Sequence, residues 1–560
     1  MEILVCADGE QVQLCELTAE LTPGATRTCT RAELPQVLAA YQDSAPRWVW
    51  ADTAALAPEL ITAGVRVNRC LDLRLCRAIL QHAVPDHDWP DLGWRTAPVV
   101  AAHPADPAVP TLWDDVPDAP SDELETLLAE RTRQQVAVTA CPEPARMRLL
   151  LAAESAGAMI AAEIAADGLP WDRAVHEDLL TEALGPRPAP GTRPARLEEL
   201  AVQIRELLAA PALNPDSPVE LLRALRRAGL DLTTTSKWEI GRLEHPVVGP
   251  LLQYKKLARL LSANGWAWLD SWVHPDPTAT ASRRPRFRPD YVPGGVVTGR
   301  WATSGGGALQ LPKQIRAAVR ADPGWRLVVA DAAQIEPRVL AAVASDDALA
   351  AAGQAGDLYQ GLVDRGVMGT RAEAKVAMLG ALYGATTGEA GLLMPRLMRA
   401  YPRATGVVEQ AARTGEQGGT VRTWLGRTSP PPPESWHERQ AAASQPEATD
   451  AVERRARQGA RDWGRFTRNF VVQGTAAEWA LCWMGEIRRR LIRYDDLGER
   501  PHLVFFLHDE VIVHAPEPVA EHVAEEVRAS ATEAGRLLFG RTPVAFPLDV
   551  AIVENYGDAD

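Results

Sequence analysis

Two short segments place acidic side chains beside runs of apolar residues, an arrangement that can hold a divalent metal ion. In the first, the apolar run Leu327–Ala330 predicts a buried strand that delivers Asp331 at its end. In the second, two β-rich stretches flank His508, Asp509 and Glu510, which predicts a hairpin with acidic residues at its tip. Together these carboxylates could bind two Mg²⁺ ions, hard cations that prefer oxygen ligands and leave positions open for substrate phosphates.

Each of these two segments also has an ordinary explanation when it is taken alone. Asp331 could simply cap a helix that begins near Ile335, and adjacent acids in a turn are usually solvated. Used together, the two acidic sites suit two-metal phosphoryl transfer. One ion would lower the pKa of an attacking hydroxyl, and the other would stabilise the leaving oxygens of pyrophosphate.

A third segment carries cations at helical spacing. Arg371, Lys375, Leu379 and Tyr383 recur every four residues, so on a helix they share one slowly drifting face. A nucleotide could lie along this face, with its triphosphate at the two cations, its sugar at Leu379 and its base pair at Tyr383. The commoner origin of such spacing is an amphipathic helix whose arginine and lysine face solvent.

The chain as a whole is acidic but contains one basic stretch. Its net charge of -14 argues against a protein that coats nucleic acid by bulk electrostatics. Residues 281–320 nevertheless hold a single acid, Asp290, against these basic residues: Arg283, Arg284, Arg286, Arg288, Arg300, Lys313, Arg316 and Arg320. This stretch is either a solvated basic loop or a strip that grips phosphates within one groove.

Length and composition favour several packed lobes. A chain of 560 residues with 46% hydrophobic content is long enough for three or four, at roughly 150 residues each. Its start lacks the charged and apolar regions of a signal peptide, and we expect no uninterrupted apolar run long enough to cross a bilayer. These features predict a cytoplasmic protein that is not bound to a membrane. The seven cysteines form no Cys-x-x-Cys pair, so we expect reduced, mostly buried thiols.

The order of the elements places the chemistry in the second half of the chain. Residues 1–95 predict a small α/β unit that starts with an Asp-Gly hairpin, and residues 97–118 predict a Pro/Ala-rich linker. Long helical patterns follow in the middle of the chain. A Pro-rich stretch from Ser429, continued by polar residues to about Asp450, predicts a flexible insertion rather than a packed element.

In their order, the three chemical segments resemble motifs A, B and C of the family-A, bacterial DNA polymerase I-like, DNA polymerases. The family patterns are Asp-x-x-Gln-Ile-Glu-x-Arg, then Arg-x-x-x-Lys followed by an aromatic residue and Tyr-Gly, then His-Asp-Glu. This sequence has Asp331, Gln334, Ile335, Glu336 and Arg338, then Arg371, Lys375, Leu379, Tyr383 and Gly384, then His508, Asp509 and Glu510. Two further segments agree, one around Arg300 and one through Arg465, Asn469 and Gln473, so the resemblance covers roughly residues 145–560.

The resemblance implies a role for each matched residue. Asp331 and Asp509, with Glu510 beside them, would bind two Mg²⁺ ions, for which Mn²⁺ could substitute. Lys375 would contact phosphates and protonate pyrophosphate, and Glu336 would exclude a 2′-hydroxyl. The other nucleotide-binding residues would be Gln334, Tyr359, Arg371, Leu379 and Tyr383, and the DNA-binding residues would be Arg300, Arg465, Asn469, Gln473, His508, Lys255 and Lys256.

The sequence departs from the family pattern near the expected nucleotide. Leu379 stands where the family usually has Phe or Tyr, which would change sugar discrimination. Ala332 and Ala333 replace the usual Tyr-Ser, and Tyr359 falls where a phosphate-contacting His is often seen. The Pro-rich stretch before Arg465 is longer than the family usually has there. Because both metal-binding Asp residues remain, we expect activity with altered kinetics.

The amino-terminal residues resemble a shortened form of the family's proofreading exonuclease domain. Proofreading needs about four carboxylates that hold two metal ions. Asp52 and Asp72 are candidates, whereas a hairpin turn explains Asp8 and Glu10. We therefore expect no 3′-to-5′ exonuclease activity. We also expect no counterpart of the large 5′-nuclease domain that often precedes such polymerases.

These observations predict an α+β multi-domain fold. A reduced, RNase H-like α/β exonuclease domain with its linker would occupy residues 1–120, and a right-hand polymerase would occupy residues 121–560. Within the latter, the thumb would span about 175–290 and the fingers about 345–425. The palm, an antiparallel sheet carrying the metal-binding carboxylates, would form the remainder.

The resemblance implies DNA-directed addition of dNTPs to the 3′-OH of primer-template DNA, by a cytoplasmic, nucleoid-associated monomer that acts in repair or gap filling. One alternative is a non-catalytic DNA-binding protein with a polymerase shape, but retention of Asp331, Asp509 and Lys375 counts against it. A nuclease acting through the first domain would need more carboxylates. Glu336 argues against an RNA polymerase or a reverse transcriptase, because it suggests selection of deoxynucleotides.

Overall fold

The computed structural model describes residues 1–41, 44–94, 123–275, 283–384, 388–494 and 499–559. Contacts within the chain divide it into two compact units. Unit 1 consists of Met1–Asp167, Asp290–Ser304 and Val328–Ile552, and unit 2 of Gly168–Pro289, Gly305–Leu327 and Val553–Asp560. The linker predicted at 97–118 lies outside the described residues.

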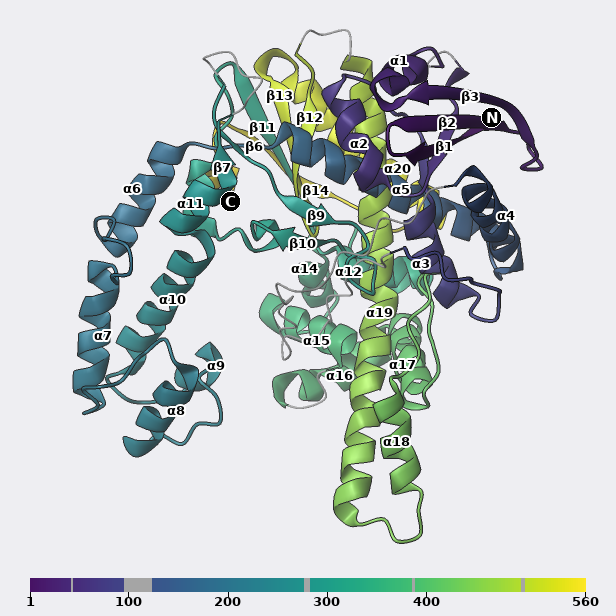
Figure 1. The fold of residues 1–560 in the computed structure, drawn as a ribbon. Helices are drawn as coiled ribbons and strands as arrows, with labels where there is room; N and C mark the ends of the chain where they lie inside the picture. Colours follow the sequence, from purple (N-terminus) through teal and green to yellow (C-terminus); the bar gives the residue numbers. More distant parts are fainter. Residues whose placement is uncertain (42–43, 95–122, 276–282, 385–387, 495–498, 560) are drawn as a thin grey trace. The chain divides into compact units, whose positions relative to one another are not determined.

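Unit 1 starts with a five-stranded mixed sheet of order β3-β2-β1-β4-β5. Figure 1 labels its first three strands, β1, β2 and β3. The predicted Asp-Gly hairpin joins β1 to β2, with Gly9 at a φ of 55° that a residue without a Cβ adopts readily. β4 is parallel to β1, and β5 is parallel to β4. The elements are β1 (Glu2–Asp8), β2 (Gln11–Leu17), β3 (Pro23–Thr30), β4 (Arg47–Trp50), β5 (Cys70–Asp72), α1 (Leu34–Ala39), α2 (Thr53–Thr62) and α3 (Leu73–Ala83).

Strand β3 was not predicted. Its side chains are nearly all exposed, so the sequence shows no apolar alternation there, and main-chain pairing with β2 alone defines the strand. The cysteine prediction is confirmed as to burial, because all seven thiols lie inside the protein.

One long helix forms the core of unit 1. α5 (Pro144–Asp167) packs against α2, α3, β5, α4 (Leu124–Ala140) and α19 (Asp450–Leu491). By length and composition alone it could cross a membrane, which corrects the expectation that the chain has no such segment. Most of its apolar stretch is buried within the protein. A helix surrounded by protein on several sides needs apolar residues around most of its circumference, which explains this composition.

A four-stranded sheet of order β12-β13-β11-β14 carries the predicted carboxylates. β11 (Trp325–Ala332) contains the predicted buried run and ends one residue after Asp331. β12 (His502–Leu507) and β13 (Glu510–Pro516) form the predicted antiparallel hairpin. β14 (Leu548–Val553) completes the sheet, and α20 (Ala520–Phe539) packs against β13 and α19.

The helices after β11 hold the predicted cationic segment. α15 (Arg371–Tyr383) contains all four residues that were predicted to share one helix face, and both of its ends are capped. Thr370 and Glu373 form a capping box at its start, and Gly384 adopts a left-handed φ of 71° at its end. Its neighbours are α12 (Ile335–Val343), α13 (Asp347–Ala352), α14 (Leu358–Asp364), α16 (Gly388–Ala400) and α17 (Pro402–Glu416).

The Pro-rich stretch is not the flexible insertion that its composition predicted. Residues Glu434–Ala443 form α18, which packs against the first turns of α19 as a helical hairpin (Figure 1). The buried Trp436 donates its indole N–H to the carbonyl of Gly459 at 3.3 Å, and the Gln440 amide donates to the carbonyl of Ala456 at 2.9 Å. A large aromatic residue within a polar stretch was the overlooked signal for packing.

Unit 2 is mainly helical, as predicted for this part of the chain. A cluster of Trp171, His176, Trp268 and Phe287 fills its interior, with neighbouring ring centroids 5.1 to 5.8 Å apart. Its helices are α6 (Arg173–Leu184), α7 (Ala195–Leu207), α8 (Pro218–Arg227), α9 (Lys237–Ile240), α10 (Val248–Asn264) and α11 (Trp266–Trp272). A short sheet of order β6-β8-β7 joins Leu169–Pro170, Arg286–Phe287 and Val273–His274.

Three arginines of the basic strip in residues 281–320 contact other segments of unit 2. In unit 2, the buried Arg286 pairs with Asp322 at 2.5 Å, and Arg284 pairs with Asp172 at 2.6 Å. The guanidinium of Arg316 lies 4.2 Å from the centre of the Tyr556 ring. Folding brings carboxylates from distant segments to these arginines, which the local charge count could not show.

His176 in the aromatic cluster is held in its neutral form. Its Nδ1 accepts the indole N–H of Trp171 at 3.2 Å, and its Nε2 donates to the carbonyl of Asn264 at 3.0 Å. Burial lowers the pKa of this imidazole to about 4. Protonation at Nδ1 would remove the acceptor that Trp171 needs.

Acid should therefore destabilise unit 2 through His176. Because folding lowers the pKa of this group from 6.5 to about 4, the unfolded chain takes up the proton first, and the free energy of unfolding falls between these pH values. We expect a loss on the order of 3 kcal/mol near pH 4 from this residue alone. Urea denaturation across this pH range should show a shallower dependence in His176→Gln, and equal slopes in the two proteins would contradict the prediction.

Candidate active site

The predicted carboxylates meet where two strands of the second sheet pair. β11 carries Asp331, and the turn between β12 and β13 carries Asp509. The main-chain N–H of Ala332 donates to the main-chain carbonyl of Asp509 at 2.8 Å, which fixes the two segments against each other. His508 adopts a left-handed φ of 59°, uncommon for a residue with a Cβ, and so makes the turn tight.

This arrangement brings like charges together in a half-buried place. Burial, and then the charge of Asp331, raises the pKa of Asp509 to about 7. Glu510, buried at the start of β13, adds to the repulsion. Within the described residues, no three His, Cys, Asp or Glu side chains are grouped as a site made by protein alone. The two aspartates therefore fit cations that complete their coordination with water and phosphate oxygens, as Mg²⁺ does.

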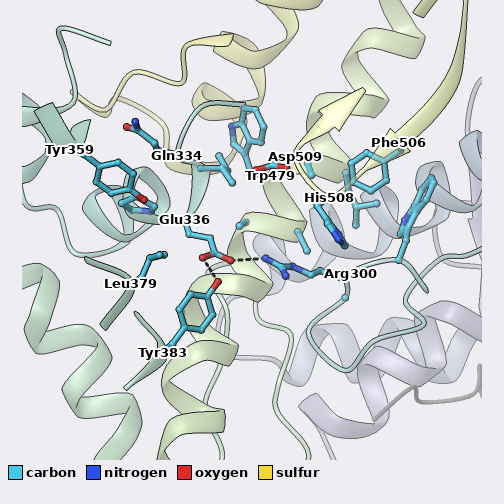
Figure 2. Close-up of a pocket in the computed structure, with 18 residues that line it drawn as sticks. Arg300, Gln334, Glu336, Tyr359, Leu379, Tyr383, Trp479, Phe506, His508 and Asp509 are labelled. Atoms are coloured by element: carbon cyan, nitrogen blue, oxygen red, sulfur yellow. Dashed lines mark hydrogen bonds and ion pairs between the residues drawn. The ribbon is translucent and has the colours of Figure 1, made fainter. Parts of the chain in front are cut away.

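A cavity of about 290 Å³ lies beside Asp509 within unit 1 (Figure 2). Segments far apart in the sequence contribute to its wall. The predicted residues that line it are Arg300, Gln334, Glu336, Tyr359, Leu379, Tyr383, His508 and Asp509. The lining also includes Gly299, Trp301, Ile335, Pro337, Ala476, Ala477, Trp479, Ala480, Leu481 and Phe506.

Glu336 is held from two sides inside this cavity, as the dashed lines of Figure 2 show. The Arg300 guanidinium donates to one carboxylate oxygen at 2.6 Å, and the Tyr383 hydroxyl donates to the other at 2.7 Å. Burial, and then the charge of Glu336, raises the pKa of Tyr383 above its ordinary value, so its hydroxyl stays a donor. The network links the segment before β10 (Ala302–Gly305) to α12 and α15.

A second network fixes α14 and the start of α15. The side-chain amide of Gln334 donates to Asp357 at 2.8 Å, and its oxygen accepts the N–H of Leu358 at 2.7 Å. Asp357 also accepts from Nε of Arg371 at 2.6 Å, and this guanidinium lies 5.7 Å from the centre of the Tyr359 ring. Gln334 and Arg371 thus position helices whatever else they bind.

Helix α15 shows the amphipathic pattern that the sequence predicted. All four predicted residues, Arg371, Lys375, Leu379 and Tyr383, are exposed or half-buried, whereas the buried side chains are Ala374, Ala377, Met378, Ala381 and Leu382. Leu379 and Tyr383 line the cavity, whereas Arg371 and Lys375 lie toward the start of the helix, outside the lining. The exposed face therefore continues from the cavity along the helix.

Three predicted DNA-binding residues lie on α19. Asn469 and Gln473 are half-buried, and Arg465 is exposed. Arg465 forms an ion pair with Asp462 and lies against Gly384, because a Cβ on that glycine would come within 2.8 Å of the arginine side chain. The same helix reaches the cavity through its next two turns, at Ala476 and Ala480.

The predicted lysines belong to α10 in unit 2. Lys256 is exposed, and the half-buried Lys255 donates to the hydroxyl of Thr235 at 3.2 Å. Arg259 on the same helix donates to the side chain of Gln310 at 3.2 Å.

The sequence interpretation gave no role to several aromatic residues of the cavity wall. Trp301, Trp479 and Phe506 are buried and line the cavity beside predicted residues. Trp301 directly follows Arg300, so adjacency to a predicted residue was the available signal. Trp479 carried no comparable signal, because its position depends on how α19 passes the sheet.

Arg338 was recognised in motif A without a role, and the structure supplies one. It is buried, and its guanidinium donates to the carbonyls of Ala333, Gly353 and Ala545 at 2.9 to 3.0 Å and to that of Gly356. These carbonyls lie in loops next to α12, α13, α14 and β14. One fixed cation therefore ties together the loops behind the cavity.

A family model described as DNA polymerase family A matches residues 192–558. The chain belongs to this family. DNA polymerase I from Chloroflexus aurantiacus is 28% identical over 342 residues, which are 56% of this chain and 33% of that protein. The thermostable DNA polymerase I of Thermus thermophilus is 27% identical over 398 residues, which are 63% of this chain and 43% of that protein. This family A polymerase thus spans less than half the length of these relatives.

A solved structure is similar over the whole chain. It is described as the POL domain of Pol1 from M. smegmatis in complex with DNA primer-template and dNTP. The TM-score is 0.66 at 16% sequence identity, and the match covers 100% of this chain and 95% of that one. This family A polymerase therefore has the polymerase-domain fold of DNA polymerase I, an α+β fold preceded by a mixed sheet.

Replacement of Arg338 by lysine should destabilise this family A polymerase by about 3 kcal/mol, because several buried carbonyls would lose their donor. Arg403→Lys is the matched control, since Arg403 is exposed and its ion pair with Asp347 spans 3.7 Å. Chemical denaturation of the three proteins measures the difference. A loss for Arg338→Lys no larger than that of the control would contradict the role assigned to Arg338.

Proposed function

We propose that the chain is a DNA-directed DNA polymerase that adds dNTPs to the 3′-OH of a primer. The observation that carries this proposal is the meeting of Asp331 and Asp509 beside a cavity whose wall continues along the cationic face of α15. Membership of family A and the fold both support it.

Asp331 and Asp509 are the side chains we propose for binding two divalent cations, with Glu510 behind them. The two half-buried carboxylates repel each other, as the raised pKa of Asp509 indicates, so cations between them would relieve this repulsion. Bound there, Mg²⁺ or Mn²⁺ would supply the charge that activates the primer hydroxyl and stabilises the leaving pyrophosphate.

The face of α15 would take the incoming nucleotide. Arg371 and Lys375 lie where they could contact its phosphates, and Lys375 would give a proton to pyrophosphate. Tyr359, next to Arg371, would complete the phosphate side, and Leu379 would contact the sugar less extensively than an aromatic ring.

Glu336 would exclude ribonucleotides because its carboxylate cannot move aside. Arg300 and Tyr383 bind its two oxygens, so a 2′-hydroxyl placed against it would meet a fixed group. The remaining contacts to primer and template would come from Arg300, His508, Arg465, Asn469, Gln473, Lys255 and Lys256. The corresponding thumb, fingers and palm would be 175–290, 345–425 and the remainder of 121–560.

The amino-terminal domain, which we propose to be RNase H-like in view of its sheet order, would not degrade primers. Its candidate carboxylates serve as helix caps. Asp72 is fully buried and accepts the N–H groups of Thr53 and Leu75 at 2.8 Å each. Asp52 accepts the N–H of Ala54 at 2.9 Å and pairs with Arg74 at 3.1 Å. Carboxylates used in this way have few lone pairs left for metal ions.

Primer extension tests the proposed polymerase. With Mg²⁺, a labelled primer-template and each dNTP, wild type should extend the primer, and Asp509→Asn should reduce the rate on the order of a thousandfold because metal binding is lost. Asp364→Asn, which changes an exposed acid on α14, should extend normally. A parallel reaction with rNTPs measures how strongly Glu336 excludes ribonucleotides. DNA binding is measured for every variant.

Two results would count against the polymerase. Undiminished extension by Asp509→Asn would remove that residue from the metal site. Absence of extension by wild type with either Mg²⁺ or Mn²⁺, while DNA is still bound, would favour a non-catalytic DNA-binding protein.

Exonuclease activity is tested on the same primers without dNTPs. We expect wild type to leave both paired and mismatched primer ends intact, because Asp52 and Asp72 are occupied as caps. The readout is shortening of the labelled primer over the time in which extension is complete. Robust shortening that disappears in Asp52→Asn would overturn this expectation.

A further inference from the structure

Among the residues that the structure describes, α17 and α18 pack on one side of the first turns of α19 and leave the other side exposed. α18 packs against Ala456 and Gly459, and α17 packs against Gly464 and Thr467. At 100° per residue, these four positions lie on one half of α19. Arg454, Gln458, Arg461 and Arg465 lie on the opposite half and are exposed.

This face is basic in an acidic protein. From Asp450 to Arg468 the helix has these arginines: Arg454, Arg455, Arg457, Arg461, Arg465 and Arg468; its acids are Asp450, Glu453 and Asp462. Arg457 pairs with Glu453, and the buried Arg468 pairs with Glu409. For Arg454 and Arg455, the described part of the chain offers no ion-pair partner, and Arg461 donates only to Gln458, at 2.9 Å.

The basic face continues directly into the residues proposed to touch DNA. Arg465, Asn469 and Gln473 follow Arg461 at four-residue steps on the same straight stretch of α19. The spacing of 1.5 Å per residue puts Arg454 about 16 Å beyond Arg465, which is roughly the length of five stacked nucleotides. A strand held at Arg465 could therefore extend along the hairpin without turning.

The position of Arg465 indicates which strand this would be. Arg465 lies against Gly384, at the carboxyl end of α15, next to Tyr383. The triphosphate would lie at the other end of α15, near Arg371 and Lys375. The basic face formed by Arg454, Arg461 and Arg465 therefore starts on the side of the nascent base pair that faces the template.

We propose that Arg454 and Arg461, with Arg465, bind phosphates of the unpaired template strand ahead of the primer end. This proposal rests on the proposed polymerase function and adds a binding site to it. The α18–α19 hairpin is the element that carries the site, and its basic face is complementary to a phosphate backbone. A sequence-independent contact of this kind would favour templates with a long single-stranded region.

Equilibrium binding of labelled primer-templates tests the proposal. One template ends at the base to be copied, and the other continues well past it as a single strand. Wild type should bind the longer template more tightly. Arg454→Gln combined with Arg461→Gln should weaken binding of the longer template about tenfold, lower its salt dependence by roughly one unit of slope, and leave the shorter template unaffected.

A matched control changes two exposed arginines on the helices behind α19. Arg413→Gln combined with Arg439→Gln alters the net charge equally and should bind both templates as wild type does. Equal binding of the two templates by wild type, or equal weakening of both by the Arg454/Arg461 variant, would overturn the proposal. If wild type binds the templates as expected but extends neither, the polymerase function fails while the site on α19 stands.

Discussion

The pairing of the β12–β13 hairpin with β11 is the constraint on which the rest of the structure depends. The hydrogen bond from the N–H of Ala332 to the carbonyl of Asp509 holds two carboxylate-bearing segments together although they lie far apart in the chain. The mutual repulsion of these half-buried carboxylates opposes this arrangement, as the raised pKa of Asp509 shows. Main-chain pairing and the apolar strands on both sides supply the stabilisation that outweighs it.

Fixed polar groups then build the cavity around this centre. Glu336 is held by Arg300 and Tyr383, and Gln334 links α12 to the start of α14. Behind them, Arg338 binds carbonyls from several loops. The Tyr383–Glu336 hydrogen bond is exposed, and the other contacts are buried or partly buried. Because an unsatisfied group would be costly in a buried place, these other contacts restrict the position of a helix more strongly than apolar packing alone. The side chains that bound the cavity are therefore held in position in the absence of a ligand.

Charged side chains differ in whether they bind other parts of the protein or remain exposed. Within this acidic chain, carboxylates from other segments pair with Arg284 and Arg286 of the basic strip. The exposed arginines on the free face of α19 differ, since α17 and α18 cover only the other side of that helix. In the amino-terminal domain two acids are used within the protein, because Asp52 and Asp72 accept main-chain N–H groups at the starts of helices. Position, rather than composition, thus decides which charges are available for chemistry.

The sequence by itself determined the strand, hairpin and helix that bear the chemical groups, because local pattern and capping specify them: the apolar run before Asp331, the acids at the hairpin tip, and the caps of α15 at Thr370 and Gly384. The family followed from the same motifs. Tertiary structure alone decided what those groups touch. The packing of α18, the partners of the basic strip and the fixed position of Glu336 all depend on contacts between segments that are distant in the sequence. A local sequence pattern cannot specify which distant carboxylate, carbonyl or indole lies beside a given side chain in the folded protein.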